Sequence, residues 1–286
     1  MFDIFKNRLE ISGILWTVTA LRISAGRSLE PIGSDLPVMK DALGRPLIPG
    51  SSFKGALRSR LESFVRGVLG DDPKNVGNPA NEDEWSITRS EMRRLKENFS
   101  SNQALTKEII EKTDLISLLF GSPWLSSKFQ VRDLTVYQPN DYWFGQYQER
   151  DGVSIDRDTE TAAEGKLYDF QVVPAGTPFE FKAVVENAEE WELGMLMIGL
   201  HQFETEQIPL GGGRSRGLGV VRLELTSQRW IDVQDDPQKL LNYLQALVQN
   251  DESAYETVSQ ALKDEWVSRF IEHLQSKCQT TTTAVS

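Results

Sequence analysis

Cysteine and histidine are nearly absent from this chain. Its 286 residues include one cysteine, Cys278, and two histidines, His201 and His273. A single cysteine cannot form an intramolecular disulfide, a cysteine-based zinc site or a C-x-x-C redox pair. Neither histidine has the spacing of an H-E-x-x-H zinc site, and the chain has no G-x-S-x-G elbow. We expect both histidines to be structural, and the composition argues against triad-type hydrolysis.

Long apolar runs are also missing. The longest, Met195 to Leu200, spans six residues, whereas a helix that crosses a bilayer needs about 20. The N-terminal sequence MFDIFKNRLE has no apolar core of a signal peptide. We therefore expect a soluble cytoplasmic protein with no membrane partner.

Basic residues are outnumbered, 31 to 42, and the formal net charge is −11. This balance argues against nucleic-acid binding, because neutralised phosphates supply most of that binding energy. The charge is nevertheless unevenly distributed. The segment from Lys40 to Arg66 carries a net charge of +4 and the segment from Gly211 to Trp230 one of +3, while residues 151–206 carry −10. Such segregation can direct an anion to one face of the molecule.

Hydrophobic periodicity predicts an α+β fold with helices on one face of an antiparallel sheet. Alternation predicts strands over residues 7–25, 128–139 and 218–226, and Gly13 is a weak point of the first. Spacings of three and four predict a helix from Ser51 or Ser52, its expected cap, to about Leu69. Further helices are predicted at 114–120, at 189–205 and in a C-terminal pair that begins near Pro237, and residues 70–113 as a polar, partly helical insertion.

Two segments are candidates for binding an anion. The run PLGGGRSRGLG combines Gly211, Gly212 and Gly213 with Arg214 and Arg216, so that backbone N–H groups and guanidinium groups can surround phosphate oxygens. It is not a Walker A loop, because no Gly-Lys-Ser or Gly-Lys-Thr follows, and it is not a dinucleotide fingerprint, because it follows a helix and precedes a strand. A structural turn with solvated arginines explains it equally well.

The second segment is PGSSFKGALR, in which Ser51 and Ser52 open a helix that carries Lys54 and Arg58 one turn apart. A helix N-terminus attracts anions through its free N–H groups and its dipole. A capped helix with a solvated basic face is the plainer interpretation. A further alternative is an α+β enzyme that binds a small phosphorylated ligand at the glycine-rich run. Asp35 lies in a loop between these two basic regions, and a single aspartate in a loop is ordinarily a turn or cap residue.

Together these runs resemble the RAMP superfamily of CRISPR-associated proteins, in particular the repeated backbone subunit of type III effector complexes. The similarity rests on ISAGRSLEPIGSDLPVMKDALGRPLIPGSSFKGALRSRLE, LFGSPW, SIDRDTETAAEGKLYDFQVVPAGTPFEF and PLGGGRSRGLGVVRLE, which occur in the family's order between about Ile11 and Glu224.

The resemblance implies a ferredoxin-like palm, similar to an RNA-recognition motif, over residues 1–230. It further implies a thumb β-hairpin at about 152–173. The resemblance does not account for the polar helical insertion at about 70–113 or for the C-terminal helical extension at 231–276, which polarity and periodicity predict, as they predict a disordered tail at 277–286. The apolar stripe of the extension would either contact a neighbouring subunit or close the chain's own core.

The implied function is binding of CRISPR guide RNA (crRNA) and of single-stranded target RNA within a complex. The other subunits would be a large polymerase-like subunit, a cap subunit, a small subunit and further backbone subunits. The glycine-rich run and the basic helix would hold the guide backbone, and Arg157 and Lys166 on the thumb would contact RNA. In the subunits of this group that cut target RNA, an aspartate before the sequence PV is catalytic, and Asp35 matches that position. It would act with a transient divalent ion, Mg²⁺ or Mn²⁺. Backbone subunits that do not cut are the alternative.

Overall fold

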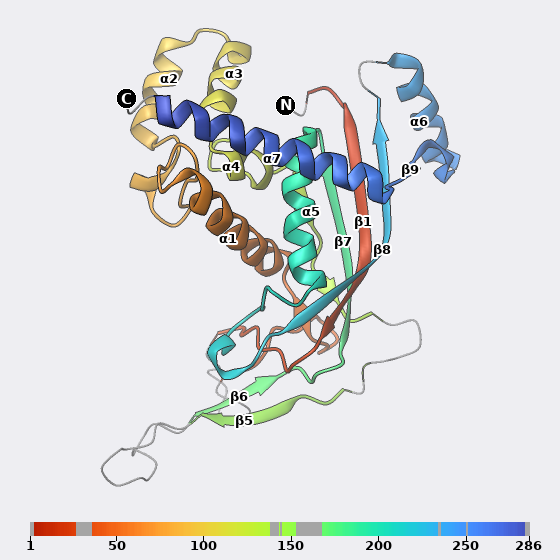
Figure 1. Ribbon diagram of the computed structural model, residues 1–286. Helices are drawn as coiled ribbons and strands as arrows, with labels where there is room; N and C mark the ends of the chain where they lie inside the picture. The colour runs from red at the N-terminus through yellow and green to blue at the C-terminus, as the bar shows by residue number, and fades with distance from the viewer. Residues whose placement is uncertain are drawn as a thin grey trace.

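The computed structural model describes residues 3–26, 36–137, 143, 145–152, 168–233, 236–249 and 251–283, with side chains through 279 (Figure 1). None of the helices in these ranges is both long and apolar enough to cross a membrane.

A five-stranded antiparallel sheet forms the centre of the protein. Its strand order is β3-β7-β1-β8-β9, and its strands are β1 (Asn7–Thr17), β3 (Phe129–Val131), β7 (Pro178–Glu186), β8 (Val221–Asp232) and β9 (Glu256–Thr257). Alternate residues of β1, among them Leu9, Ile11 and Leu15, are buried on one face. The β1–β8 register shifts between Ser12 and Gly13, which confirms the expected weak point.

Helices α1 (Gly50–Leu69), α5 (Glu190–Glu204) and α7 (Gln260–Thr283) lie on one side of this sheet (Figure 1). Phe53 of α1 stacks on Phe203 of α5 with ring centroids 4.3 Å apart, and lies 4.9 Å from the Phe181 ring of β7. The predicted α+β arrangement is confirmed.

The start of α1 differs from the prediction. The helix begins at Gly50 and not at a serine cap, and Asp133 accepts a hydrogen bond from the Gly50 N–H at 2.8 Å. A Cβ atom at Gly50 would overlap with the Val131 carbonyl oxygen. Because the helix end packs directly against the chain that follows β3, a distant carboxylate replaces the local hydroxyl cap.

The C-terminal helix α7 closes the chain's own core. Trp266 is buried in the main hydrophobic cluster together with Phe270 and Leu274, and its backbone lies so close to Gly194 of α5 that a side chain at 194 would overlap with it. Of the two interpretations of this apolar stripe, core closure is confirmed for these residues. The helix continues to Thr283, so the expected tail boundary at 277 falls inside it.

The remaining elements flank this core. The insertion contains η1 (Glu82–Glu84), α2 (Arg89–Asn98) and α3 (Asn102–Lys112), and α4 (Leu115–Phe120) follows it. A small separate cluster, with Met92, Leu95 and Ile109 at its centre, stabilises the insertion.

Helix α6 (Pro237–Gln249) and the turn η3 (Glu252–Ala254) lie beside the β8 edge (Figure 1).

A second, smaller region lies at the end of the molecule opposite to α2 and α3. It contains the pair β2 (Leu47–Ile48) with β4 (Leu134–Thr135), the turn η2 (Arg214–Arg216), and a projecting hairpin of β5 (Gln148–Gly152) and β6 (Tyr168–Val172) (Figure 1). The hairpin stem overlaps the expected thumb at 152–173, and residues 153–167 lie outside the described ranges.

Candidate nucleic-acid interface

The chain segment after β1, residues 20–25, connects the parts of this smaller region. We call it the strip. On one side it binds the glycine loop, residues 211–219, because the Gly212 N–H donates to the Arg22 carbonyl at 2.8 Å and the Gly219 N–H donates to the Ala20 carbonyl at 2.9 Å. The glycine loop is therefore held through its backbone, and its two arginines, Arg214 and Arg216, are exposed.

Two positions in the glycine loop accept only glycine. Gly211 and Gly219 have positive φ angles, 74° and 86°. A Cβ atom at Gly211 would overlap with the Arg22 carbonyl oxygen, and one at Gly219 with the Leu210 carbonyl oxygen. The sequence predicted positive φ and close backbone approach in this loop, and both are confirmed here.

A groove of about 550 Å³ separates the glycine loop from α1. Serine hydroxyl groups and two guanidinium groups line it, from residues Ser51, Ser52, Ser59, Ser63, Arg60 and Arg214. Hydroxyl, guanidinium and backbone N–H groups are the common protein ligands of phosphate oxygens. The fold thus brings the two segments that were candidates for anion binding, 51–52 and 211–214, to the walls of one groove.

Arg60 is a groove residue that the sequence analysis did not single out. Its Nη2 donates to the Gln207 carbonyl at 2.6 Å, which directs the guanidinium group toward the glycine loop. Arg60 follows Ser52 by two helical turns, so the same face of the predicted helix already contained it. That spacing was the signal that could have identified it.

Lys54 and Arg58 lie on another flank of α1. Arg58 donates to Glu62 at 2.7 Å, to the Gly121 carbonyl at 2.9 Å and to Ser117 Oγ at 3.0 Å. Lys54 Nζ donates to Ser127 Oγ at 2.6 Å, and burial together with the Arg58 charge lowers the pKa of Lys54 to about 8. Neither side chain lines the groove. Arg58 is held against α4 and Gly121, and Lys54 against the segment that follows α4.

Arg216 connects the glycine loop to the hairpin stem. Its Nη1 donates to the Tyr168 hydroxyl at 3.0 Å. Two residues further along β6, the Phe170 ring lies under the guanidinium group of Arg22, 4.6 Å from its centroid. Guanidinium groups and aromatic rings therefore alternate at the base of the hairpin. Arg157 and Lys166, the predicted thumb contacts, lie outside the described residues.

Asp35, the predicted catalytic residue, also lies outside the described residues, which resume at Leu36. Leu36 forms a bridge with Phe170 of β6, and the Gln171 N–H donates to the Leu36 carbonyl at 3.1 Å. Val38 forms a further bridge with Ser24 of the strip. The chain therefore leaves the Asp35 loop between the strip and the hairpin stem.

The described residues contain no group of three or more His, Cys, Asp or Glu side chains that could hold a metal ion. His201 is exposed beside Glu204, 3.2 Å away. The His273 ring stacks on Trp191, with centroids 4.4 Å apart, and burial lowers its pKa. These contacts agree with the structural roles expected for both histidines.

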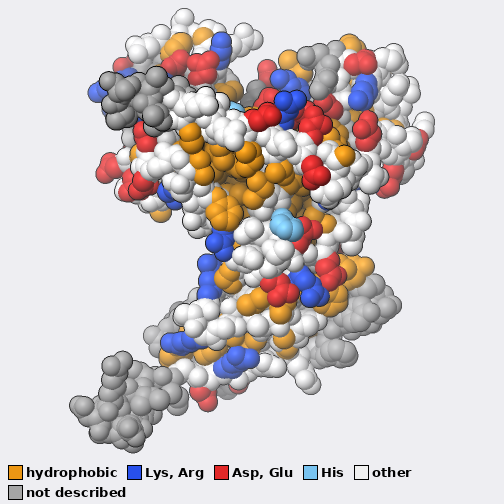
Figure 2. Space-filling view, in the orientation of Figure 1, with side chains coloured by type: hydrophobic (Ala, Val, Ile, Leu, Met, Phe, Trp, Pro, Cys, Tyr) orange, Lys and Arg blue, Asp and Glu red, His pale blue; other side chains and the backbone are white. Residues whose placement is uncertain are grey.

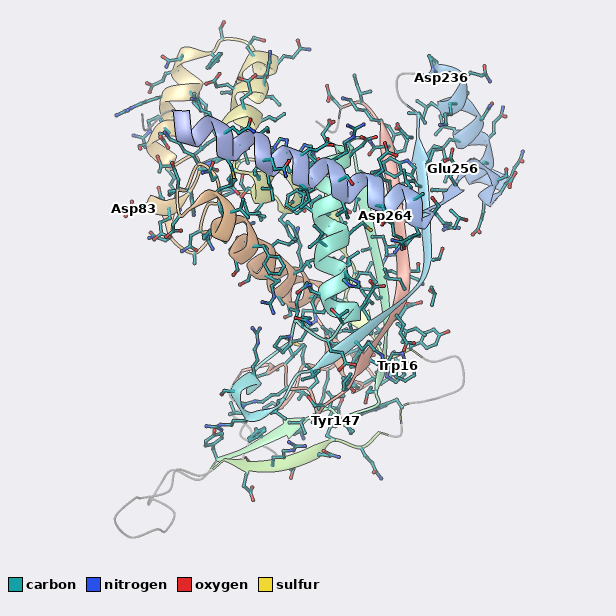
Figure 3. All side chains as sticks on the ribbon, in the orientation of Figure 1. Trp16, Asp83, Tyr147, Asp236, Glu256 and Asp264 are labelled. Atoms are coloured by element: carbon teal, nitrogen blue, oxygen red, sulfur yellow. The ribbon has the colours of Figure 1, made fainter. Side chains whose placement is uncertain are left out.

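Basic side chains reach the lower part of the molecule. Figure 2 shows Lys and Arg along the narrow middle and over the lower part of this face, with further Lys and Arg at the upper end and Asp and Glu at both levels. In Figure 3, Asp83 lies at the insertion and Asp236 beside α6, whereas Tyr147 lies beside the hairpin. Because strand β5 of the hairpin itself carries the exposed Glu149 and Asp151, the charge that suits an anion is local to the groove and its arginines.

Comparison with known proteins identifies the family. The model of the RAMP superfamily matches residues 15–222. The chain is 28% identical to the CRISPR system Cms endoribonuclease Csm3 of Enterococcus italicus over 224 residues, which cover 77% of this chain and 92% of that protein. It is 28% identical over 225 residues to the protein of the same name from Methanocaldococcus jannaschii (76% and 79% covered) and 25% identical over 220 residues to that from Streptococcus thermophilus (76% and 87%). The matched range contains the strip, α1, the hairpin stem and the glycine loop, and this chain belongs to the RAMP superfamily.

Proposed function

We propose that this protein is a crRNA-binding backbone subunit of a type III CRISPR ribonucleoprotein and that it cleaves target RNA with Asp35. The observation that carries the proposal is the groove between α1 and the glycine loop. The strip that holds the glycine loop is also bridged to Val38, three residues after Asp35. The printed names of the relatives, all Csm3 endoribonucleases, support the same assignment.

The proposed palm is ferredoxin-like. The strands β1, β3, β7 and β8 have the spatial order β3-β7-β1-β8, and helices α1 and α5 follow the first and third of them in the chain. This is the β-α-β-β-α-β connection of a ferredoxin-like fold. We propose the β5–β6 hairpin as the stem of the thumb, with Arg157 and Lys166 as its RNA contacts.

Guide binding in this proposal is mainly electrostatic and independent of sequence. Ser51, Ser52 and Arg60 would contact guide phosphates from one wall of the groove, and Arg214 from the other. Gly211, Gly212 and Gly213 would shape the loop that carries Arg214, since the Gly212 N–H donates to the Arg22 carbonyl. Lys54 and Arg58 would then act on the guide only indirectly, by holding α1 in place. The partners proposed are the guide, single-stranded target RNA and the other subunits of the complex, in the cytoplasm.

Cleavage would use the ribose next to the scissile phosphate. The Asp35 carboxylate accepts a hydrogen bond from the 2′-hydroxyl and withdraws its proton as the 2′-oxygen attacks phosphorus. The bond from phosphorus to the 5′-oxygen breaks, and that oxygen takes a proton from water, which leaves a 2′,3′-cyclic phosphate and a 5′-hydroxyl. A splayed nucleotide favours the in-line geometry that this attack needs.

We also propose that cleavage depends on a divalent ion, Mg²⁺ or Mn²⁺. Since the described residues offer no cluster of three ligands, the ion would be held by Asp35 together with phosphate oxygens of the RNA, as Mg²⁺ commonly is. It would stabilise the charge that develops on the phosphate.

The test is cleavage of end-labelled target RNA by the reconstituted complex with Mg²⁺. We expect Asp35→Ala to abolish regularly spaced cuts while target affinity is retained, and chelation of the metal to do the same. Asp83→Asn, which removes an exposed carboxylate of η1 in the insertion, is the matched control and should cut like the wild type.

If every cut survives in Asp35→Ala, the chain is a structural crRNA-binding subunit of the same complex, and another protein cuts the target. If the purified full chain shows no salt-sensitive binding of single-stranded RNA, both RNA functions fail, and a small phosphorylated ligand becomes the better candidate for the groove.

A further inference from the structure

Six residues form a small hydrophobic cluster that is separate from the main core. Its members are Ala20, Leu36, Tyr168, Phe170, Val172 and Leu218, and we call this cluster the joint. They come from four segments: the strip, the chain directly after Asp35, strand β6 and the glycine loop. These are the segments to which the proposed function assigns guide binding, target contact and cleavage.

Strand β6 is the centre of the joint. Phe170 is bridged to Leu36, and the neighbouring Gln171 N–H donates to the Leu36 carbonyl. The Tyr168 ring covers Gly152 across the hairpin stem so closely that a Cβ atom at 152 would overlap with it. Tyr168 and Phe170 also contact each other, with centroids 6.1 Å apart. Leu36 is thus held by β6, whereas the next residues are held by the strip, because the Ala25 N–H donates to the Pro37 carbonyl and Val38 is bridged to Ser24.

The Tyr168 hydroxyl adds a polar connection to the glycine loop. It accepts a hydrogen bond from Arg216 Nη1, while Leu218 on the same loop is buried in the joint. A guanidinium group has five N–H donors, and the bond to Tyr168 uses one. Arg216 can therefore hold an RNA phosphate and the Tyr168 hydroxyl at the same time.

We propose that the joint connects occupancy of the glycine loop by RNA to the position of Leu36, and that Tyr168 is thereby a positioning residue for cleavage. The cleavage part rests on the proposed function, whereas the mechanical connection between Arg216, Tyr168 and Leu36 does not. When a phosphate orders Arg216, the hydroxyl contact holds β6 and, through the Phe170 bridge, the residue that directly follows Asp35.

The test is Tyr168→Phe in the reconstituted complex. This change removes the hydroxyl and keeps the ring over Gly152. Tyr255→Phe is the matched control, since the Tyr255 hydroxyl also has hydrogen bonds, to Tyr243 and Glu10, but lies outside the joint. Guide content, target affinity, the single-turnover cleavage rate and hydrogen exchange of the peptides that contain Leu36 and Gln171 are measured for each protein.

For Tyr168→Phe we expect unchanged guide content and target affinity and a cleavage rate lower by about 10-fold or more, since small misplacements of a catalytic group have effects of this size. In the wild type, guide binding should slow exchange at Gln171, and this protection should be lost by about 2–10-fold in the variant, as for one hydrogen bond. Arg216→Met combined with Tyr168→Phe should be no slower than Arg216→Met alone, because Arg216→Met already removes the contact to the Tyr168 hydroxyl.

Unchanged cleavage together with unchanged exchange in Tyr168→Phe would overturn the proposal, and so would a parallel loss of guide, target binding and cleavage. Should the complex not cut through Asp35, the exchange measurement still decides: a Gln171 amide that is insensitive to the guide in the wild type refutes the connection. Failure of the joint and failure of the proposed nuclease therefore give different results.

Discussion

Arg58 and Arg60 offer the sharpest test of which basic residues bind RNA. They are two positions apart in α1, but Arg58 makes three internal hydrogen bonds and Arg60 makes one at the edge of the groove. We predict that Arg58→Met lowers stability and that Arg60→Met lowers RNA affinity. The two variants remove the same charge from the same helix, so each is the control for the other.

The magnitudes follow from the contacts. Three hydrogen bonds at about 0.5–1.5 kcal/mol each predict that Arg58→Met reduces the free energy of unfolding by about 1.5–4.5 kcal/mol. Among the described residues, the change also leaves Glu62, which is 8% exposed, with only Arg66 at 3.6 Å as an ion-pair partner. Arg60→Met should cost less than about 1 kcal/mol, because it loses one hydrogen bond at the surface.

Urea unfolding of the full chain measures the first effect, and single-stranded RNA binding at several salt concentrations measures the second. Loss of one phosphate contact should reduce the slope of log K against log salt by about 0.7 for Arg60→Met, whereas folded Arg58→Met should keep the wild-type slope. The reasoning is refuted if Arg58→Met loses the salt slope while its free energy of unfolding is unchanged.

Three further predictions concern backbone strain, a buried ion pair and pH. Gly211→Ala should lower both stability and RNA retention, by about 1–3 kcal/mol in unfolding free energy, while Gly212→Ala, where a Cβ meets no atom within 4 Å, should have little effect; urea unfolding and guide content compare them. Lys128→Met should destabilise by about 3–5 kcal/mol, because it removes the cation 2.5 Å from the buried Glu192 carboxylate and leaves it, among the described residues, only the Glu189 N–H as a hydrogen-bond donor. Calorimetry should show recovery when Glu192→Leu is added, and no recovery would contradict a desolvation penalty. Because the pKa of Lys54 is lowered to about 8, the unfolded chain binds more protons than the folded one between that pH and the usual lysine value. The stability of the wild type relative to Lys54→Met should therefore rise from about pH 8 to about pH 10.5, and a constant difference in urea unfolding would show that Lys54 titrates normally.

The sequence by itself determined the elements whose pattern is local. Alternation in β1, the three-and-four spacing of α1 and the positive φ of Gly211 and Gly219 were all predictable, because each depends on near neighbours in the chain. The family resemblance likewise came from short runs in a fixed order, and the match over residues 15–222 confirms it.

Tertiary structure decided what each polar side chain does. The predicted strand at 128–139 is divided into β3 and β4, which belong to different sheets, and Asp133 between them caps α1. From the sequence, Arg58 could not be distinguished from a solvated arginine, because its partners in α4 and at Gly121 are about 60 residues away in the chain. Arg60 lines a groove only because the glycine loop lies across from α1 in the fold. Such roles depend on partners far away in the chain, and periodicity reports which face of a helix a residue occupies but not what packs against that face.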